Sequence, residues 1–254
     1  MNGTLATTGW YVFGVVAADT DVEGVVLVRH GDLAAIVTQV DLAEFGEEAL
    51  RDRLNDRAWL EDTALRHADV LQRVAAQREV VPLRFGTIYD ERSDVARLLE
   101  ARGDEFRAAL ERVKGCIELG VKVWVDRGRF EQSSAGRRPE ADSTPGRAYM
   151  LRRRDEQRAA SESSSRLAQL AQGLHAQLGA LAVDAAVNRP QPRELTGRDE
   201  TMLLNAAYLV PRGDVRLEAA VAGLQAAYGG LGITFEVTGP WPPHNFVEAG
   251  DDQT

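Results

Sequence analysis

The sequence predicts an α+β protein with two domains. Apolar residues alternate with a period of two in several short runs, as in half-buried strands, and recur every three or four residues in longer runs, as in helices. At 254 residues the chain is near the size at which a single hydrophobic core stops growing. Gly115 follows a helical pattern and precedes an alternating one, which favours a boundary there. We therefore expect an N-terminal α+β domain over residues 1–115 and a C-terminal domain over residues 116–254.

In the first half, strand patterns come first and helical patterns follow. His30, Gly31 and Asp32 separate two strands and are typical of a short hairpin turn. Pro82 places a later extended run, 80–88, at a strand start or at the edge of a sheet. The other expected strands are 11–18, 25–29 and 33–40, and the expected helices are a short one around Leu50 and longer ones over 56–77 and 95–113, the last with a weak point at Gly103.

The second half predicts a ferredoxin-like domain, because its elements follow the order β-α-β-β-α-β. Right-handed crossovers would put both helices on one face of a four-stranded antiparallel sheet. The run 202–210 is almost wholly apolar, as expected for a central strand covered on both faces. The expected strands are 117–125, 181–187, 202–210 and 231–237, and the expected helices are 145–178 and 217–228.

Two segments around the long first helix of this domain are unusually polar. Residues 127–146 are rich in glycine, serine and charge, so we expect a loop there. Thr144 and Pro145 are a good N-cap and first-turn pair for the helix that follows. Within that helix, residues 152–166 have almost nothing to bury, which predicts that this part projects beyond the domain.

The chain closes on a proline- and tryptophan-rich arm, TGPWPPHNFV, over residues 238–247. Proline offers no N–H, so we expect the arm to leave the sheet rather than to extend it. Its main interpretation is structural: the arm packs back onto the protein and closes one domain against the other. Docking of a partner is the alternative, and the residues concerned in either case are Trp241, Pro242, Pro243 and Phe246.

The composition bounds the class of protein. A net charge of −9 argues against a general nucleic-acid binder, which needs an excess of basic residues. Cys116 is the only cysteine, which excludes an internal disulfide and a multi-cysteine zinc site. No signal-peptide pattern opens the chain, and no apolar run is long enough to cross a bilayer. We expect a chain that is neither secreted nor membrane-spanning.

The sequence contains no recognisable catalytic constellation. Signatures of zinc proteases, serine hydrolases and phosphate-binding loops are absent, and the four histidines are scattered without metal-ligand spacing. His67 lies beside a helical apolar stripe and predicts a partly buried structural histidine, whereas His175 is expected to face solvent. We expect no catalytic residue, no metal site and no cofactor.

Two pairs remain as candidates for interaction. Arg84 and Phe85 lie where a proline-started strand breaks at Gly86; the arginine is interpreted as salt-bridged at the domain seam. Lys122 and Trp124 share one face of a strand, either as a lysine stem lying beside an aromatic ring or as a pair that contacts a ligand.

Four stretches, taken together, resemble the gas vesicle protein F/L family (GvpF/GvpL). They are VVPLRFGTIY at 80–89, ELGVKVWVD at 118–126, NAAYLV at 205–210 and TGPWPPHNFV at 238–247. WLEDTALRH at 59–67 also fits the first long helix of the family. The likeness covers roughly residues 10–247, and the one departure is His244, where the family more often has tyrosine.

The resemblance implies a non-enzymatic accessory or minor structural protein of gas vesicles, involved in their assembly. It implies an N-terminal α+β domain and a C-terminal ferredoxin-like domain. The expected partners are the main shell protein and other accessory gas vesicle proteins, with no nucleic acid, membrane or small-molecule substrate. The expected location is the gas vesicle in the cytoplasm, where the F member is placed on the gas-facing side of the shell. The alternative is a regulatory protein that binds a small ligand on its ferredoxin-like sheet, through Lys122 and Trp124.

Overall fold

The chain folds into two compact units in a computed structural model that describes residues 8–53, 55–134 and 145–247. The first unit contains the chain up to Glu118 together with the residues from Pro240 onward, and the second contains Leu119–Gly239. The sequence had suggested a division at Gly115 and had placed the closing arm with the second domain.

An antiparallel five-stranded sheet forms the centre of the first unit. Its order is β2-β3-β1-β4, with β5 also paired to β1. The strongly apolar β1 lies inside the sheet and has six consecutive buried residues, from Tyr11 to Val16. The predicted run 80–88 contributes only two short strands, because the chain turns between them. The strands are β1 (Thr8–Ala17), β2 (Val26–His30), β3 (Leu33–Asp41), β4 (Val81–Pro82) and β5 (Ile88–Tyr89).

The helices of the first unit follow from capping and from apolar spacing. Asp56 caps the first turn of α3 by accepting from Ala58 N and Trp59 N, and four buried residues of α3 recur at three- or four-residue steps. The predicted helix 95–113 is two helices, interrupted at Arg102 beside the expected weak point Gly103. The helices are α1 (Leu42–Phe45), α2 (Glu47–Arg53), α3 (Arg57–Ala75), α4 (Arg92–Ala101) and α5 (Gly103–Arg112).

The second sheet has the order β7-β8-β6-β9 and is antiparallel. The apolar strand β8 lies between two neighbours, as its sequence predicted. Its strands are β6 (Cys116–Val125), β7 (Asp184–Val187), β8 (Thr201–Pro211) and β9 (Ile233–Trp241).

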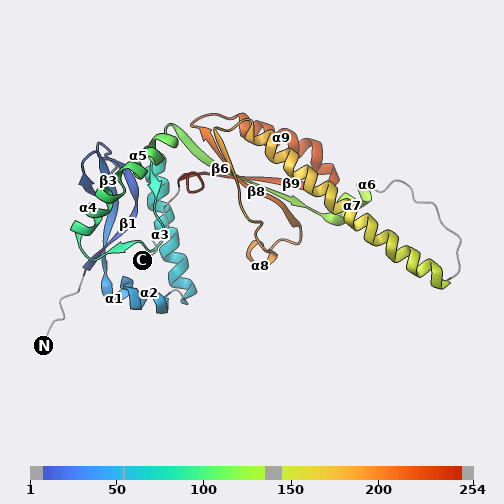
Figure 1. The fold of residues 1–254 in the computed structure, drawn as a ribbon, viewed down its shortest axis with the longest axis horizontal. Coiled ribbons are helices and arrows are strands. Elements are labelled where there is room, and N and C mark those ends of the chain that lie inside the picture. The colour runs from blue at the N-terminus through green and yellow to red at the C-terminus, as the bar shows by residue number, and fades with distance from the viewer. Residues whose placement is uncertain (1–7, 54, 135–144, 248–254) are drawn as a thin grey trace. The chain divides into compact units, whose positions relative to one another are not determined.

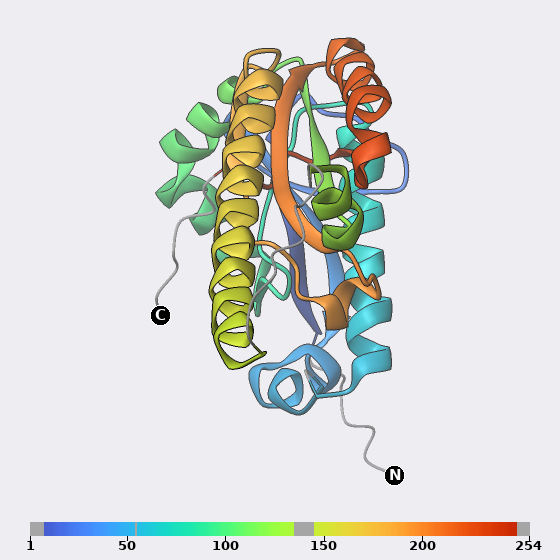
Figure 2. The ribbon, with the colours of Figure 1, turned by 90° about the vertical axis from the view of Figure 1, so that its right-hand side faces the viewer.

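Helices α7 (Pro145–Gly179) and α9 (Arg216–Tyr228) lie on one side of this sheet (Figure 1). Leu167, Leu174 and Leu178 of α7 are buried, whereas its N-terminal part runs on beyond the end of the sheet, as the polar sequence predicted (Figures 1 and 2). The expected loop 127–146 is wrong in its first part, which forms α6 (Arg127–Ser134), and residues 135–144 lie outside the described part. A short α8 (Arg193–Thr196) and the 3₁₀ turn η1 (Gly229–Leu231) complete the unit.

The expectation that the arm leaves the sheet at Thr238 is also wrong. Strand β9 continues through Gly239 and Pro240 to Trp241. Because β9 is an edge strand with β6 on one side only, a residue without an N–H is tolerated where it faces outward. The turn that leaves the sheet begins at Pro242, where His244 N donates to Pro242 O.

Candidate functional site

The first unit contains a groove with a volume of about 760 Å³. We call it the α3 groove. One wall is helix α3, from Asp62 to Arg73, and the other is formed by β3, by the start of β2 and by α1. The lining residues include Val26, Ile36–Asp41, Glu44, Asp62, Leu65, Arg66, Asp69 and Arg73.

A hydrogen-bonded pair lies at the base of this groove. The hydroxyl of Tyr11 is 2.9 Å from Nδ1 of His67, and the same oxygen accepts from the backbone N–H of Gly86 at 3.1 Å. His67 also bonds to the carbonyl of Leu83, so its Nε2 carries the hydrogen and Nδ1 accepts from Tyr11. The pair therefore links β1, α3 and the PLRFGT turn through buried, mutually satisfied polar groups.

Burial determines how these groups titrate. His67 is 7% exposed; burial lowers its pKa to about 4, and the nearby charge of His244 acts in the same direction. Burial likewise raises the pKa of Tyr11 to about 12, against the opposing effect of the Gly86 hydrogen bond. At neutral pH both side chains are therefore uncharged. This supports the prediction that His67 is a structural histidine, and it gives no support to a role as a general base.

Of the candidate interaction residues from the sequence, Phe85 lies beside the Tyr11–His67 pair. Its ring lies 6.4 Å from that of Tyr11 and 5.8 Å from that of His67, measured between centroids. Arg84 is exposed, and its carbonyl accepts from Thr87 N and from Thr87 Oγ1, which closes the turn. Sequence reasoning had noted His67 but had not linked it with Tyr11, since 56 residues separate the two.

The C-terminal arm is anchored by a buried carboxylate that sequence reasoning missed. Glu118 is 4% exposed and accepts from Asn245 N at 2.9 Å and from Asn245 Nδ2 at 2.6 Å. Burial raises the pKa of Glu118, and the two hydrogen bonds from Asn245 partly oppose that shift. Pro242, Pro243 and Phe246 are buried, whereas Trp241 is 40% exposed.

Lys122 and Trp124 lie on β6 of the second unit. Trp124 is 2% exposed, and the guanidinium of Arg198 lies 4.7 Å from the centroid of its ring. Arg198 also pairs with Glu236 at 3.2 Å, while Lys122 is half-buried. The indole nitrogen of Trp124 has no hydrogen-bond partner among the described residues.

His175 does not face solvent freely, contrary to its expectation. Its Nδ1 lies 3.0 Å from the hydroxyl of Tyr208, which is fully buried on β8. The contact connects α7 to the central strand of the second sheet. Burial raises the pKa of Tyr208 beyond its ordinary value.

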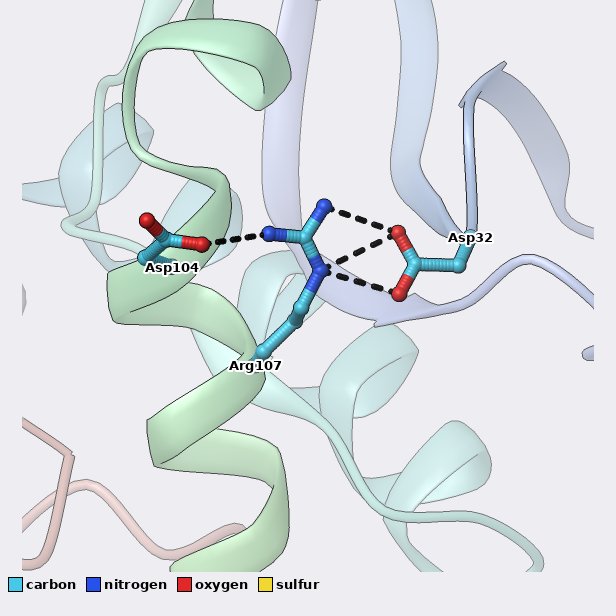
Figure 3. Close-up of polar contacts among 3 residues, drawn as sticks. All are labelled: Asp32, Asp104 and Arg107. Carbon is cyan, nitrogen blue, oxygen red and sulfur yellow. Dashed lines mark hydrogen bonds and ion pairs between the residues drawn. The ribbon is translucent and has the colours of Figure 1, made fainter.

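An exposed charge cluster fixes the β2–β3 hairpin against α5 (Figure 3). Arg107 Nε lies 2.9 Å from Asp32 Oδ2, and Arg107 Nη1 lies 2.7 Å from Asp104 Oδ1. The hydrogen bond from Arg107 holds the pKa of Asp32 below its usual value. This cluster joins elements within the first unit.

The described residues offer surfaces suited to binding. Within residues 8–53, 55–134 and 145–247, no group of three or more His, Cys, Asp or Glu is placed to hold a metal ion. None of the helices in that part is both long and apolar enough to cross a membrane. The α3 groove is instead a concave apolar surface with charged walls, and the arm presents a half-exposed indole.

Comparison with known proteins gives one consistent result. The model of the family "Gas vesicle synthesis protein GvpL/GvpF" matches residues 9–248. Gas vesicle protein L of Streptomyces sp. (strain CB03234) is 37% identical over 226 residues, which are 89% of this chain and 84% of the relative. Gas vesicle protein F of the same strain is 27% identical over 225 residues, which are 87% of each chain.

The fold has a counterpart among solved structures. The crystal structure of the gas vesicle protein GvpF from Anabaena sp. PCC7120 superposes with a TM-score of 0.69 at 18% sequence identity. The match covers 96% of this chain and 97% of the other. At that level of identity the likeness concerns the fold, which is shared over both units.

Proposed function

Because the chain belongs to the GvpL/GvpF family of gas vesicle synthesis proteins, with a role in gas vesicle formation, we propose that it is an accessory protein of gas vesicle assembly. In this proposal it binds the main shell protein and other accessory gas vesicle proteins, and acts without catalysis. The observation that carries the proposal is the family match over residues 9–248. The higher identity with protein L than with protein F of one Streptomyces strain favours an L-type role.

We further infer that the second unit is a ferredoxin-like domain. The order β6-α7-β7-β8-α9-β9 along the chain and the order β7-β8-β6-β9 in the sheet support this assignment. Such a domain presents one helical face and one sheet face. The inserted helices α6 and α8 are additions to that plan.

The proposed binding surfaces are those that the fold leaves concave or half-exposed. In the first unit they are the α3 groove and Trp241, whose indole is flanked by prolines that limit its backbone freedom. A partly exposed tryptophan on a restricted backbone is a common anchor at protein interfaces. A negatively charged chain would also help to keep a hydrophobic shell subunit dispersed before assembly.

Co-purification tests the proposal. The chain would be tagged at its N-terminus, since Phe246 and Val247 near the other end are buried. Expressed with the gas vesicle proteins of its own source, it should retain the main shell protein on the affinity resin, whereas a tagged protein of similar charge should not. Normal vesicles in cells that lack the chain, together with an empty resin, would refute the proposal.

The ligand-binding alternative has no observation in its favour. It requires Lys122 and Trp124 to offer a reachable surface, and the side chain of Trp124 is 2% exposed beneath Arg198.

A further inference from the structure

Strand β3 has one side that is only partly paired. On its inner side, β1 pairs with it along its whole length, from Thr8 opposite Asp41 to Ala17 opposite Leu33. On its outer side, β2 pairs only with residues Leu33–Val37. No other described strand reaches the outer side, so the stretch Thr38–Asp41 has an open edge.

A glycine explains why β2 begins so late. The residues before Val26 would continue the antiparallel pairing, with Val25 and Gly24 opposite Thr38 and Gln39. Gly24 instead has φ of 78°, in the left-handed region, and turns the chain off the line of the strand. The open edge is thus built into the backbone of the hairpin.

The α3 groove follows this edge. Six consecutive residues of β3, Ile36–Asp41, line it. Tyr11 and Phe13 of β1 also line the groove, so part of it lies over the face of the sheet that faces α3. Successive side chains of a strand point to opposite faces, so the run of consecutive lining residues on β3 shows that the groove also reaches the edge of the sheet. Unpaired backbone N–H and C=O groups therefore meet the groove, and these groups bind another strand readily.

The side chains around the edge specify what could bind. Val26 is 55% exposed and Leu65 is 63% exposed, and they present apolar surface on the two walls. Asp62 and Asp69 each pair with an arginine of α3, Arg66 and Arg73. The negative charges of Asp62 and Asp69 are therefore already neutralised within α3.

Two further carboxylates of the groove are not balanced. Asp41 accepts from Ala43 N, and Glu44 accepts from Trp59 Nε1 at 2.7 Å. Neither has an ion-pair partner among the described residues of the chain. The end of the groove next to α1 therefore carries net negative charge. It favours a ligand with a positively charged group at that end.

We propose that the open edge of β3 binds an extended segment of a partner protein, which adds a strand beside Thr38–Asp41. The segment carries apolar residues toward Val26 and Leu65, and a lysine or arginine toward Asp41 and Glu44. A strand fits better than a helix because only a strand would satisfy the open backbone groups. A second copy of this chain fits poorly, since pairing two such edges would bring four carboxylates together.

This inference rests on the proposed function, because it gives an assembly protein a site for one of its partners. The test uses a labelled eight-residue peptide of alternating valine and threonine with lysine at both ends. A second peptide has glutamate at both ends, and a third has the lysines but is N-methylated at alternate residues. Binding is followed by fluorescence anisotropy, and amide hydrogen exchange is measured on the full chain.

The lysine peptide should bind at least about tenfold more tightly than either of the others. It should also slow amide exchange within residues 38–41, because a new strand protects those groups. Equal binding of the N-methylated peptide, or binding without protection of 38–41, would overturn the proposal. Protection that depends on protein concentration without peptide would assign the edge to a second copy instead.

Matched variants test the charge. D41N/E44Q keeps both acceptors for Ala43 N and Trp59 Nε1 but removes two negative charges. It should weaken binding of the lysine peptide at least about threefold. D52N/E61Q removes the same charge from exposed positions outside the groove and should leave binding unchanged. Equal effects of the two double variants would overturn the charge assignment.

The apolar contact has its own control. L65D should abolish binding of the lysine peptide, whereas V215D places the same charge at an equally exposed valine of the second unit and should not. If the peptide fails to bind but the shell protein still co-purifies, strand binding at the edge of β3 is refuted and the proposed function is retained. If the peptide binds and no gas vesicle protein co-purifies, the function falls and the edge remains a strand-binding site.

Discussion

Glu118 and Asn245 are joined by two hydrogen bonds although 127 residues separate them in the chain. One carboxylate accepts both the backbone and the side-chain N–H groups of the asparagine, and it does so while 4% exposed. The contact ties the turn after Pro243 to the end of the first continuous stretch of the first unit. It holds the arm, which bears few regular elements, against the first unit.

Replacement of Glu118 should therefore destabilise the fold. E118A removes the acceptor of two N–H groups of Asn245, which is itself exposed, and we expect a loss of about 1–2 kcal/mol. Urea unfolding at pH 7 measures this loss in the free energy of unfolding. The control is E100A, on the exposed face of α4. A loss equal to that of E100A would show that the arm is held by its apolar residues alone.

The pH dependence of Glu118 has a defined sign. Its folded-state pKa is raised, so the folded chain binds this proton more readily than the unfolded chain. Its contribution to stability therefore grows as pH falls through the raised pKa and is constant below the ordinary one. Comparison of the wild-type chain with E118Q, whose side chain does not titrate, isolates this contribution in urea titrations between pH 4 and pH 7.

His67 should act in the opposite direction. Its pKa is lowered to about 4 in the folded chain, so its contribution is complete above its ordinary pKa of 6.5 and is lost as pH falls toward 4. The shift corresponds to about 3 kcal/mol. H67Q should lower stability at pH 7 but remove this dependence, while Y11F should keep it. An unchanged pH profile in H67Q would assign the acid sensitivity to other groups.

Trp241 and Phe246 should differ although both belong to the arm. Phe246 is 4% exposed, and F246A should cost about 3–5 kcal/mol through lost burial and the cavity that remains. Trp241 is 40% exposed, so W241A should lower the melting temperature much less. If W241A instead destabilises as much as F246A, the indole serves packing, and its use as a docking group is excluded.

The ion pair between Arg107 and Asp32 should contribute little and should depend on salt. Both groups are exposed, so R107A should lower the melting temperature slightly at low salt and not at about 0.5 M NaCl. Because the pKa of Asp32 is lowered, its contribution is present above the ordinary aspartate pKa and is lost as pH falls through the lowered value. A salt-independent loss in R107A would indicate that the arginine stem packs against the hairpin.

Local patterns predicted most of the elements. The strands at 11–18 and 33–40 and the helix at 56–77 correspond to β1, β3 and α3, because burial of one face leaves a periodic signal in the sequence. The long helix after Thr144 and the central strand at 202–210 were also predicted. The family resemblance is confirmed by the match over residues 9–248.

The failures have a common physical origin in partners that are distant in sequence. Glu118 alternates with apolar residues and carries no sequence signal of burial, yet it is 4% exposed and binds Asn245 of the arm. His175 was expected in solvent, and the hydroxyl of Tyr208 binds it. Pro240 was expected to end the sheet, and its place on an edge strand permits it. The open edge of β3 has no sequence signal except Gly24, whose turn could have suggested it.

The first unit is assembled from both ends of the chain, since the residues from Pro240 onward belong to it together with those up to Glu118. During synthesis, about 120 residues of the second unit emerge before the C-terminal residues of the first unit do. Until then Glu118 has no hydrogen bond to Asn245. Translation therefore delays completion of the unit that carries the α3 groove until the residues from Pro240 onward have emerged. The residues that line the groove, from Tyr11 to Arg73, are thus synthesised well before the arm that completes their unit.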